Sequence, residues 1–254
     1  MVFTSVEHDW TLLPQCSRHR AQFDDRSASK PALLAAFDHT QCDAVLSAMR
    51  ARGTAYVPTH VASTGQDAAF ASGPPASPNT ARFIPLPQRL AWHLVRMAGA
   101  VNANEARDLG AYHAAALQLT QRAHRAGVVV LAGTDALDPE VVHGFALHDE
   151  LQYLVRAGLT PAQALAAATT VPARFMGVDH AVGKIANGQR ADLVLLEANP
   201  LVDIRNTARI HTVIFDGRVF GPAERANLLT FVEQQAHRAT IASRFFRGLW
   251  YDGE

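Results

Sequence analysis

Two side chains of cation-binding type end apolar runs that lie far apart in the chain. His8 closely follows the run at residues 2–6, and Asp135 ends the run at residues 128–134. Imidazole nitrogen and carboxylate oxygen are the ligands expected of a zinc-type site, in which bound water becomes a nucleophile near neutral pH. His8 and Asp135 are therefore candidate metal ligands, and Asp135 is also a candidate to take and return the proton of that water.

Each of these residues also has a simpler interpretation. Asp135 can cap the turn that follows it, as a Gly-Thr-Asp triplet commonly does. His8 can be a hydrogen-bonded turn histidine beside Asp9. Both alternatives stay open from the residues alone. Because a carboxylate at the end of a buried strand needs a partner, we expect a cationic group opposite Asp135.

Strands and helices alternate along the part of the chain that carries these residues. Apolar runs predict strands at residues 2–6, 54–58 and 128–134. Capping residues and helical spacing predict helices at 38–53, 104–126, 138–158 and 160–176. This alternation indicates parallel βαβ units, in which strands end at a common rim.

Other polar residues near the predicted rim are weaker candidates. Thr59 and His60 follow the second strand and could contact a substrate, although a plain strand-end role is equally consistent with the sequence. His143 is a further candidate for substrate binding. His148 is expected in the core or on the surface, and Glu150 is expected to be a solvated helix charge. Nucleotide-binding loops and the serine-hydrolase elbow are absent from the sequence.

The remaining segments predict a boundary after residue 176. Residues 63–88, rich in Pro, Ser, Ala and Gly, are expected to form a long surface loop. Strands at 191–196, 211–215 and 218–220, with a turn at Asp216-Gly217, predict a small antiparallel module. A helical tail begins near residue 223, with Leu228, Leu229, Val232 and Ala236 on one stripe. The expected units are residues 1–176, 177–222 and 223–254.

The overall composition favours small-molecule chemistry. Lys and Arg number 23 and Asp and Glu number 23, so the neutral chain is not an electrostatic nucleic-acid binder. No apolar run approaches a membrane span, and the first residues do not resemble a secretory leader, so we expect a cytoplasmic location. Cys16 and Cys42 have neither metal-type nor redox-type spacing and are expected to be reduced, inert thiols.

Six stretches together resemble the carboxyl half of the metal-dependent amidohydrolase superfamily, in the branch that includes imidazolonepropionase and prolidase-like enzymes. They are SVEH, YVPTH, VVVLAGTDA, LHDELQYLVRAGLTPAQALAAATTVPARFMG, GKIANGQRADLVLLEANPLVDI and VIFDGRVF. The resemblance covers roughly residues 3–220. It implies an α/β fold: the last three strands of a TIM-type (β/α) barrel, part of a small β-sandwich and a terminal helix. The implied activity is hydrolysis of carbon–nitrogen bonds in amides, cyclic amides or dipeptides, with one or two divalent metals, usually zinc.

The resemblance also assigns roles to the two strand-end residues. His8 matches the metal-ligating histidine of the sixth strand. Asp135 matches the eighth-strand aspartate, which binds metal and shuttles the proton. The family's His-x-His pair, its carboxylated lysine and its fifth-strand histidine have no counterpart in this sequence. Two ligands rarely hold a catalytic metal, so we expect the isolated chain to be weak or inactive and to lack stoichiometric zinc.

Length supports the expectation of an incomplete barrel. A full barrel takes about 250 residues, yet 119 residues (254 minus 135) follow Asp135. We therefore expect a truncated gene product or one piece of a split enzyme, completed by an N-terminal fragment or by a homo-oligomer. The alternative is a non-catalytic binding or oligomerisation module, because a three-strand parallel sheet leaves edges and apolar faces uncovered.

Overall fold

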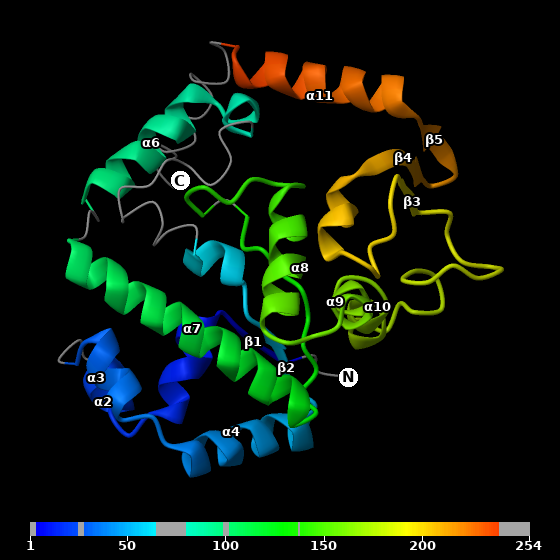
Figure 1. Ribbon diagram of the computed structural model, residues 1–254. Helices are drawn as coiled ribbons and strands as arrows, with labels where there is room; N and C mark the ends of the chain where they lie inside the picture. Colours follow the sequence, from blue (N-terminus) through cyan, green and yellow to red (C-terminus); the bar gives the residue numbers. More distant parts are fainter. Residues whose placement is uncertain (1–3, 25–27, 65–79, 99–101, 137, 239–254) are drawn as a thin grey trace, which may run out of the picture.

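The computed structural model describes residues 4–24, 28–64, 80–98, 102–136 and 138–238 (Figure 1). Strand β1 (Ser5–Glu7) pairs in parallel with β2 (Ala55–Val57), with Val6 opposite Tyr56. Between them lie α1 (Asp9–Leu12), η1 (Leu13–Cys16), α2 (Arg20–Asp24), α3 (Lys30–Ala35) and α4 (His39–Arg52). The predicted parallel connection between the first two strands is confirmed.

The third predicted strand is shorter than expected. Tyr56 N donates to Val129 O at 2.8 Å and Leu131 N donates to Tyr56 O at 2.9 Å, which makes a single parallel bridge between Tyr56 and Val130. Ala55 and Val57, which flank Tyr56 in β2, direct their backbone hydrogen bonds to β1. Only Tyr56 is therefore able to bond to the 128–134 segment. The prediction of a strand over 128–134 is therefore wrong in extent, although this segment does lie beside β2 in parallel.

Local capping chemistry sets the ends of the predicted helices. The Asp38 carboxylate accepts from the backbone of Thr40 and Gln41, and Gly53 ends α4 in the left-handed conformation. Capping boxes begin α7 (Ala103–Arg125) and α9 (Pro161–Ala167), which is followed by α10 (Thr170–Phe175). Because each capping contact involves residues only a few positions apart, the sequence predicts these helix ends correctly.

Two helix predictions and one loop prediction are wrong. The helix predicted over 160–176 is divided into α9 and α10. Helix α8 (Ala146–Arg156) begins well after Asp138, whose carbonyl accepts from Val141 in a turn instead. Val141 and Val142 are buried there, so packing overrides the Asp-Pro start signal. The predicted loop at 63–88 contains η2 (Ala81–Phe83) and the start of α6 (Leu86–Ala98), while residues 65–79 lie outside the described ranges.

Both faces of β2 are buried, as expected for a strand inside a layered α/β core. Tyr56 packs into a cluster with side chains of η1, α3, α4 and α7. On the opposite face, Ala55 and Val57 contact Leu131, with Val171 and Phe175 of α10 packed against them. Helices α4 and α7 therefore cover one face of β2 and α10 covers the other. Figure 1 shows α7 passing across the two strands.

The carboxyl-terminal part forms the predicted antiparallel sheet from β3 (Leu193–Leu196), β4 (Ile210–Phe215) and β5 (Arg218–Phe220). Asp216 and Gly217 have φ of 49° and 76°, the backbone that a two-residue hairpin turn requires. Helix η3 (Ile204–Ala208) packs on α8, and α11 (Pro222–Ala236) follows the sheet. Leu228, Leu229 and Val232 of the predicted stripe are exposed.

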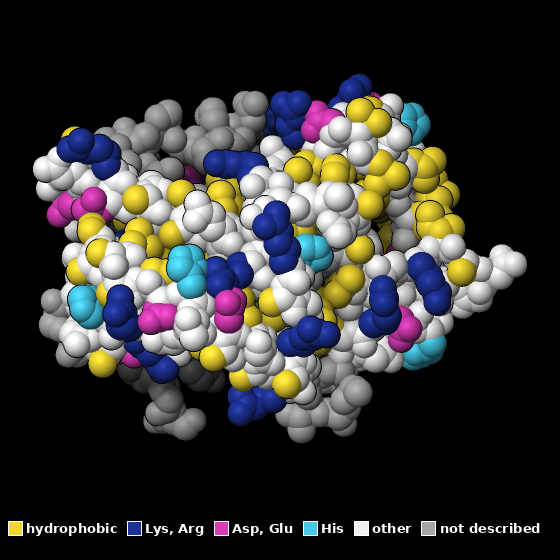
Figure 2. Space-filling model, turned by 60° about the horizontal axis from the view of Figure 1, so that its bottom comes forward, with side chains coloured by type: hydrophobic (Ala, Val, Ile, Leu, Met, Phe, Trp, Pro, Cys, Tyr) yellow, Lys and Arg dark blue, Asp and Glu magenta, His cyan; other side chains and the backbone are white. Residues whose placement is uncertain are grey.

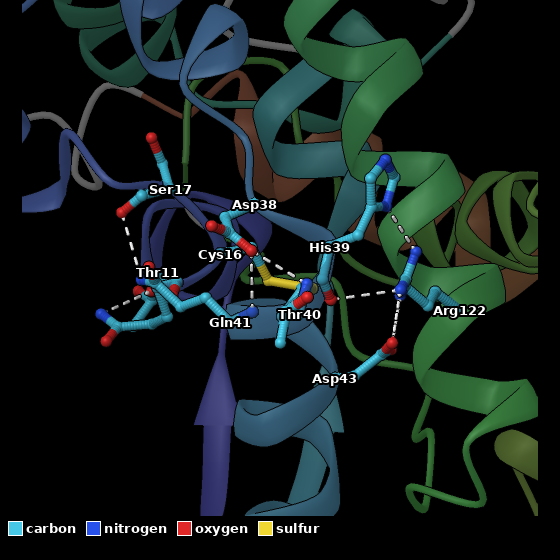
Figure 3. Close-up of a disulfide and its surroundings, with 11 residues drawn as sticks. Thr11, Cys16, Ser17, Asp38, His39, Thr40, Gln41, Asp43 and Arg122 are labelled. Carbon is cyan, nitrogen blue, oxygen red and sulfur yellow. Dashed lines mark hydrogen bonds and ion pairs between the residues drawn. A yellow bond between two sulfur atoms is a disulfide. The ribbon is translucent and has the colours of Figure 1, made fainter.

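Cys16 and Cys42 form a disulfide, which corrects the expectation of reduced thiols (Figure 3). The end of η1 lies against the first turn of α4: Asp38 N donates to Cys16 O at 2.8 Å, and Gln41 Nε2 donates to Gln15 O at 2.7 Å. This tertiary contact brings the two Cα atoms to 4.2 Å, which cysteine spacing in the sequence could not reveal. Disulfides persist mainly in oxidising compartments, so this one argues against the predicted cytoplasmic location.

The described surface agrees with the neutral composition. Figure 2 shows basic and acidic side chains interspersed on one face of the molecule, without a field of one sign. None of the helices in the described ranges is long and apolar enough to cross a bilayer.

Candidate active site at the strand ends

The structure brings together His8, Thr59 and Asp135 from the ends of three neighbouring parallel segments. His8 Nδ1 shares a hydrogen bond of 2.9 Å with Thr59 Oγ1. The same nitrogen lies 3.7 Å from Asp135 Oδ2. His8 is thus the group opposite Asp135, where the sequence predicts a cationic partner. The Asp135 carbonyl accepts from Asp138 N at 3.2 Å, so the turn is closed by backbone while the carboxylate faces the histidine.

All three residues have a left-handed backbone, which is unusual for side chains other than glycine. The φ angles are 68° at His8, 49° at Thr59 and 51° at Asp135. Each such position costs roughly 1–3 kcal/mol and persists only where the surrounding structure enforces it. The cost is greatest for a β-branched residue such as threonine. Strain that gathers at three contacting strand ends is independent evidence that this rim is functional.

The His8 ring is fixed in both plane and rotation. It stacks on Trp10 with ring centroids 4.2 Å apart and planes 9° from parallel. Because Nδ1 faces Thr59 and Asp135, Nε2 is the ring nitrogen that no described residue engages in a hydrogen bond. The side chains of His8 and Asp135 are 26% and 44% exposed, so both can be reached from solvent.

His60 lies beneath this rim and points into the protein. Its ring is buried, with Nδ1 3.2 Å from Asp9 Oδ2 and Nε2 2.9 Å from Thr120 Oγ1. Thr59, the preceding residue, uses its hydroxyl on His8. His143 is exposed at the surface of the loop before α8. The substrate contacts proposed for Thr59, His60 and His143 stay predictions, and the buried contacts of His60 favour a structural role.

Glu150 is fully buried, so its prediction as a solvated helix charge is wrong. Its Oε2 accepts from Val61 N at 2.9 Å, which caps the helical turn that follows β2. Burial raises the pKa of the carboxyl from 4.5 to about 7, against the opposing effects of His60 and of backbone hydrogen bonds. A sequence signal does exist: Glu150 is four residues from both Ala146 and Leu154, which are buried on the same helical face.

A cavity of about 470 Å³ is lined by Val61 and Thr64 of this helical turn and by residues of α8. Its lining combines apolar and aromatic side chains with the charged groups of Glu140, Asp149 and Arg156. His148 also lines it and bonds Thr207 Oγ1 at 3.1 Å; burial lowers its pKa. Burial raises the pKa of Asp149. This cavity could hold part of a substrate.

The described residues do not by themselves make up a metal centre. His8 and Asp135 are suitable donors and converge at the rim, but no group of three or more His, Cys, Asp or Glu side chains is placed to hold a metal ion within the described ranges. A catalytic zinc site takes three protein ligands. The pair therefore fits two of the positions, and further ligands are needed.

Residues 96–220 match the Amidohydrolase family. This segment, slightly less than half of the chain, is similar to that family. It contains Asp135 and Glu150, whereas His8 and Thr59 precede it. The resemblance seen in the sequence is confirmed over the matched residues, and the rim joins a residue of the family segment to residues outside it.

Individual proteins are similar to parts of this chain. Ochratoxinase of Aspergillus niger is 37% identical over 91 residues, which are 35% of this chain and 18% of the enzyme. The structure of a bottromycin amidohydrolase aligns with a TM-score of 0.65 and 24% identity, over 91% of this chain and 48% of that one. A Xaa-Pro dipeptidase with bound methionine aligns with a TM-score of 0.52 and 20% identity, over 86% and 40%. The fold is shared, and the chain spans less than half the length of each.

Proposed function

We propose that this chain supplies the His8 and Asp135 part of a metal-dependent site that hydrolyses carbon–nitrogen bonds in an amide, cyclic amide or dipeptide. One observation carries the proposal: an imidazole and a carboxylate converge at 3.7 Å on strained strand ends. That Asp135 lies in the segment matching the Amidohydrolase family supports the reaction class.

The geometry suggests a separate role for each residue. A bound divalent cation, which we propose to be zinc, would lower the pKa of a ligated water to about 7. Asp135 Oδ would take the proton of the attacking water and return it to the leaving nitrogen. His8, with its ring plane fixed by Trp10, would offer a ring nitrogen to the metal. Thr59 would orient the His8 ring, and His143 would contact substrate.

The two ligands present imply that the site is completed by other groups. We propose that these come from a complementing polypeptide that adds the rest of the barrel, of which β1, β2 and the 128–134 segment would be the last three strands. The proposed units remain residues 1–176 for this partial barrel, 177–222 for part of a β-sandwich and 223–254 for the tail. Activity of the chain by itself is then expected to be weak or absent.

Zinc titration of the purified chain tests this proposal. We expect weak calorimetric binding in the wild type, and loss of binding in both His8→Asn and Asp135→Asn, because each variant removes one of the two donors. His180→Asn, which changes an exposed histidine away from the rim, is the matched control. Binding that is unchanged in both rim variants, or equally lost in the control, would show that these residues do not hold the metal.

Hydrolysis is tested separately with the zinc-loaded chain. N-acyl amino acids, dipeptides and cyclic amides cover the proposed substrate class, and release of the amine is measured with the wild type and Asp135→Asn. Slow release that disappears in the variant supports the reaction class. Equal release by both proteins contradicts the role of Asp135.

A non-catalytic binding or oligomerisation module remains a second candidate, favoured by apolar side chains exposed on α6 and α11. They include Leu90, Leu94, Leu228, Phe231 and Val232. Sedimentation velocity over a hundredfold range of concentration tests this candidate, since a chain that stays monomeric throughout does not use these faces for self-association.

A further inference from the structure

We propose that Asp9 and His60 form a buried clamp that positions His8 and Thr59 at the rim. The clamp consists of Asp9, His60 and Thr120, and its functional meaning rests on the function proposed above. Neither Asp9 nor His60 would touch substrate or metal. Each would act through the residue that precedes it in the chain.

Two successive pairs of side chains join the first strand end to the second. At the rim, His8 Nδ1 and Thr59 Oγ1 are 2.9 Å apart. One residue further along each segment, Asp9 Oδ2 and His60 Nδ1 are 3.2 Å apart. Both links span 51 residues in sequence. The first pair is partly exposed, while the second pair is buried, so the lower link supports the upper one from inside the protein.

The hydrogen bonds of Thr120 define the direction of one contact in the clamp. Thr120 Oγ1 donates its one proton to Ala116 O at 3.1 Å, because a carbonyl can only accept. The hydroxyl must therefore accept from His60 Nε2 at 2.9 Å. On the other side of the ring, His60 Nδ1 lies 3.2 Å from Asp9 Oδ2. The buried ring of His60 is thus held at both of its nitrogens.

Surrounding contacts join the clamp to α8. Asp9 N donates to Pro58 O at 3.0 Å, which fixes the backbone of the first strand end against the second. Glu150 Oε2 accepts from Val61 N, next to His60, and so ties α8 to the same turn. The first two strand ends and α8 are therefore connected beneath the rim through the segment that carries His60.

The backbone at the rim explains why such support is needed. His8 and Thr59 adopt left-handed conformations that relax unless the structure around them is rigid. A buried hydrogen-bonded pair resists separation because its polar groups would be left unpaired in the interior. Loss of the clamp should therefore release the orientation of the His8 ring, even while the fold persists.

Nitrogen NMR of the histidine rings tests the clamp on the full chain labelled with ¹⁵N-histidine. His8→Gln and His60→Gln assign the two sets of ring signals. We expect a proton on Nε2 of His60, which donates to Thr120, and a single tautomer for His8. A His60 ring without a proton on Nε2 would overturn the assigned hydrogen-bond direction and with it the clamp.

The decisive variant is Asp9→Asn/His60→Leu, which removes the pair without leaving a buried charge. We expect a folded protein in which the His8 signals move to the average of two tautomers. His148→Leu is the control, since it removes another part-buried histidine contact while leaving the His8 signals unchanged. Asp9→Asn alone keeps an acceptor for His60 and should shift His8 less, which provides a second folded variant.

The result that would overturn the proposal is a lower melting temperature with wild-type His8 signals, because a purely structural pair would give that pattern. This readout needs neither zinc nor turnover. If the chain neither binds zinc nor hydrolyses amides, the proposed function fails but the clamp can still hold. If the chain binds zinc but the His8 signals are unchanged in Asp9→Asn/His60→Leu, only the clamp is rejected.

Discussion

The Glu150 carboxyl is the clearest case of a residue whose environment changes its chemistry. It is fully buried, and burial raises its pKa to about 7. The unfolded chain releases this proton near pH 4.5, whereas the folded chain keeps it to about pH 7. Between these values the folded state binds more protons, so the stability contributed by this group falls as the pH rises.

Glu150→Gln should remove this pH dependence while keeping an oxygen that can accept from Val61 N. We expect the wild type to lose on the order of 2–3 kcal/mol more unfolding free energy than the variant between pH 4.5 and 7.5. Urea denaturation of both proteins at several pH values measures the difference. Parallel pH profiles would mean that Glu150 is ionised in the folded protein throughout this range.

The sequence predicts the residues of the rim better than the residues beneath it. His8 and Asp135 are visible because each closely follows an apolar run, and strand ends meet at one rim. Asp9 is not, because its burial depends on how α1 packs after the chain has folded, and for Glu150 the one signal is its helical spacing from Ala146 and Leu154. His60 shows the same limit: its position beside Thr59 indicates the rim, but its side chain turns inward to Asp9.

At the scale of elements, the close approach of the 128–134 segment to β2 depends on a missing side chain. A β-carbon added to Gly133 would overlap Val57 Cγ1. Val57 belongs to β2, and its side chain is buried in a cluster with residues of α10. No such constraint applies to Gly110 within α7, where an added β-carbon meets no atom of a described residue within 4 Å. Glycine has a packing role at the first position and none at the second.

Gly133→Ala should therefore destabilise the fold by about 1–3 kcal/mol, because the added methyl overpacks the core. Gly110→Ala should stabilise it by about 0.5–1 kcal/mol through helix propensity. Thermal or urea unfolding measures both. Val57→Ala/Gly133→Ala makes room for the methyl and should show less than the summed cost of the two single changes. Equal effects of the two glycine substitutions would contradict the proposed overlap.

Elements with local signals were predictable, and elements decided by packing were not. Helix α4 follows from Asp38 and Gly53, which act within one turn of the helix ends. Helix α6 was missed because Pro87 suggests a loop, although proline is compatible with the first turn of a helix. The strand predicted at 128–134 was too long. Its length is limited by its neighbour β2, which has only three residues, and the sequence of 128–134 carries no information about that neighbour.

At the scale of the whole molecule, the Cys16–Cys42 disulfide joins the segment after the first strand end to α4. It closes a separation of 26 residues and lies in the same buried cluster as Tyr56 and Tyr112. Closing a loop of this length restricts the unfolded chain. The expected stabilisation is roughly 3 kcal/mol.

Removal of the disulfide should lower stability without changing the architecture. Cys16→Ser/Cys42→Ser is expected to unfold at a lower urea concentration than the oxidised wild type and to be unaffected by reductant. The wild type should shift toward the variant when reductant is added. Mass spectrometry after thiol alkylation counts the free thiols in parallel, and two free thiols in a wild type purified without reductant would contradict the assigned bond.

The positive φ angles at His8, Thr59 and Asp135 limit how the thermal stability of this chain can be raised by mutation. Glycine adopts that conformation at little cost, so a library selected for heat tolerance alone is drawn toward glycine at all three positions. Those substitutions would delete the imidazole, the hydroxyl and the carboxylate together. Any engineering for thermal tolerance must therefore hold these three positions fixed and seek its gains elsewhere in the chain.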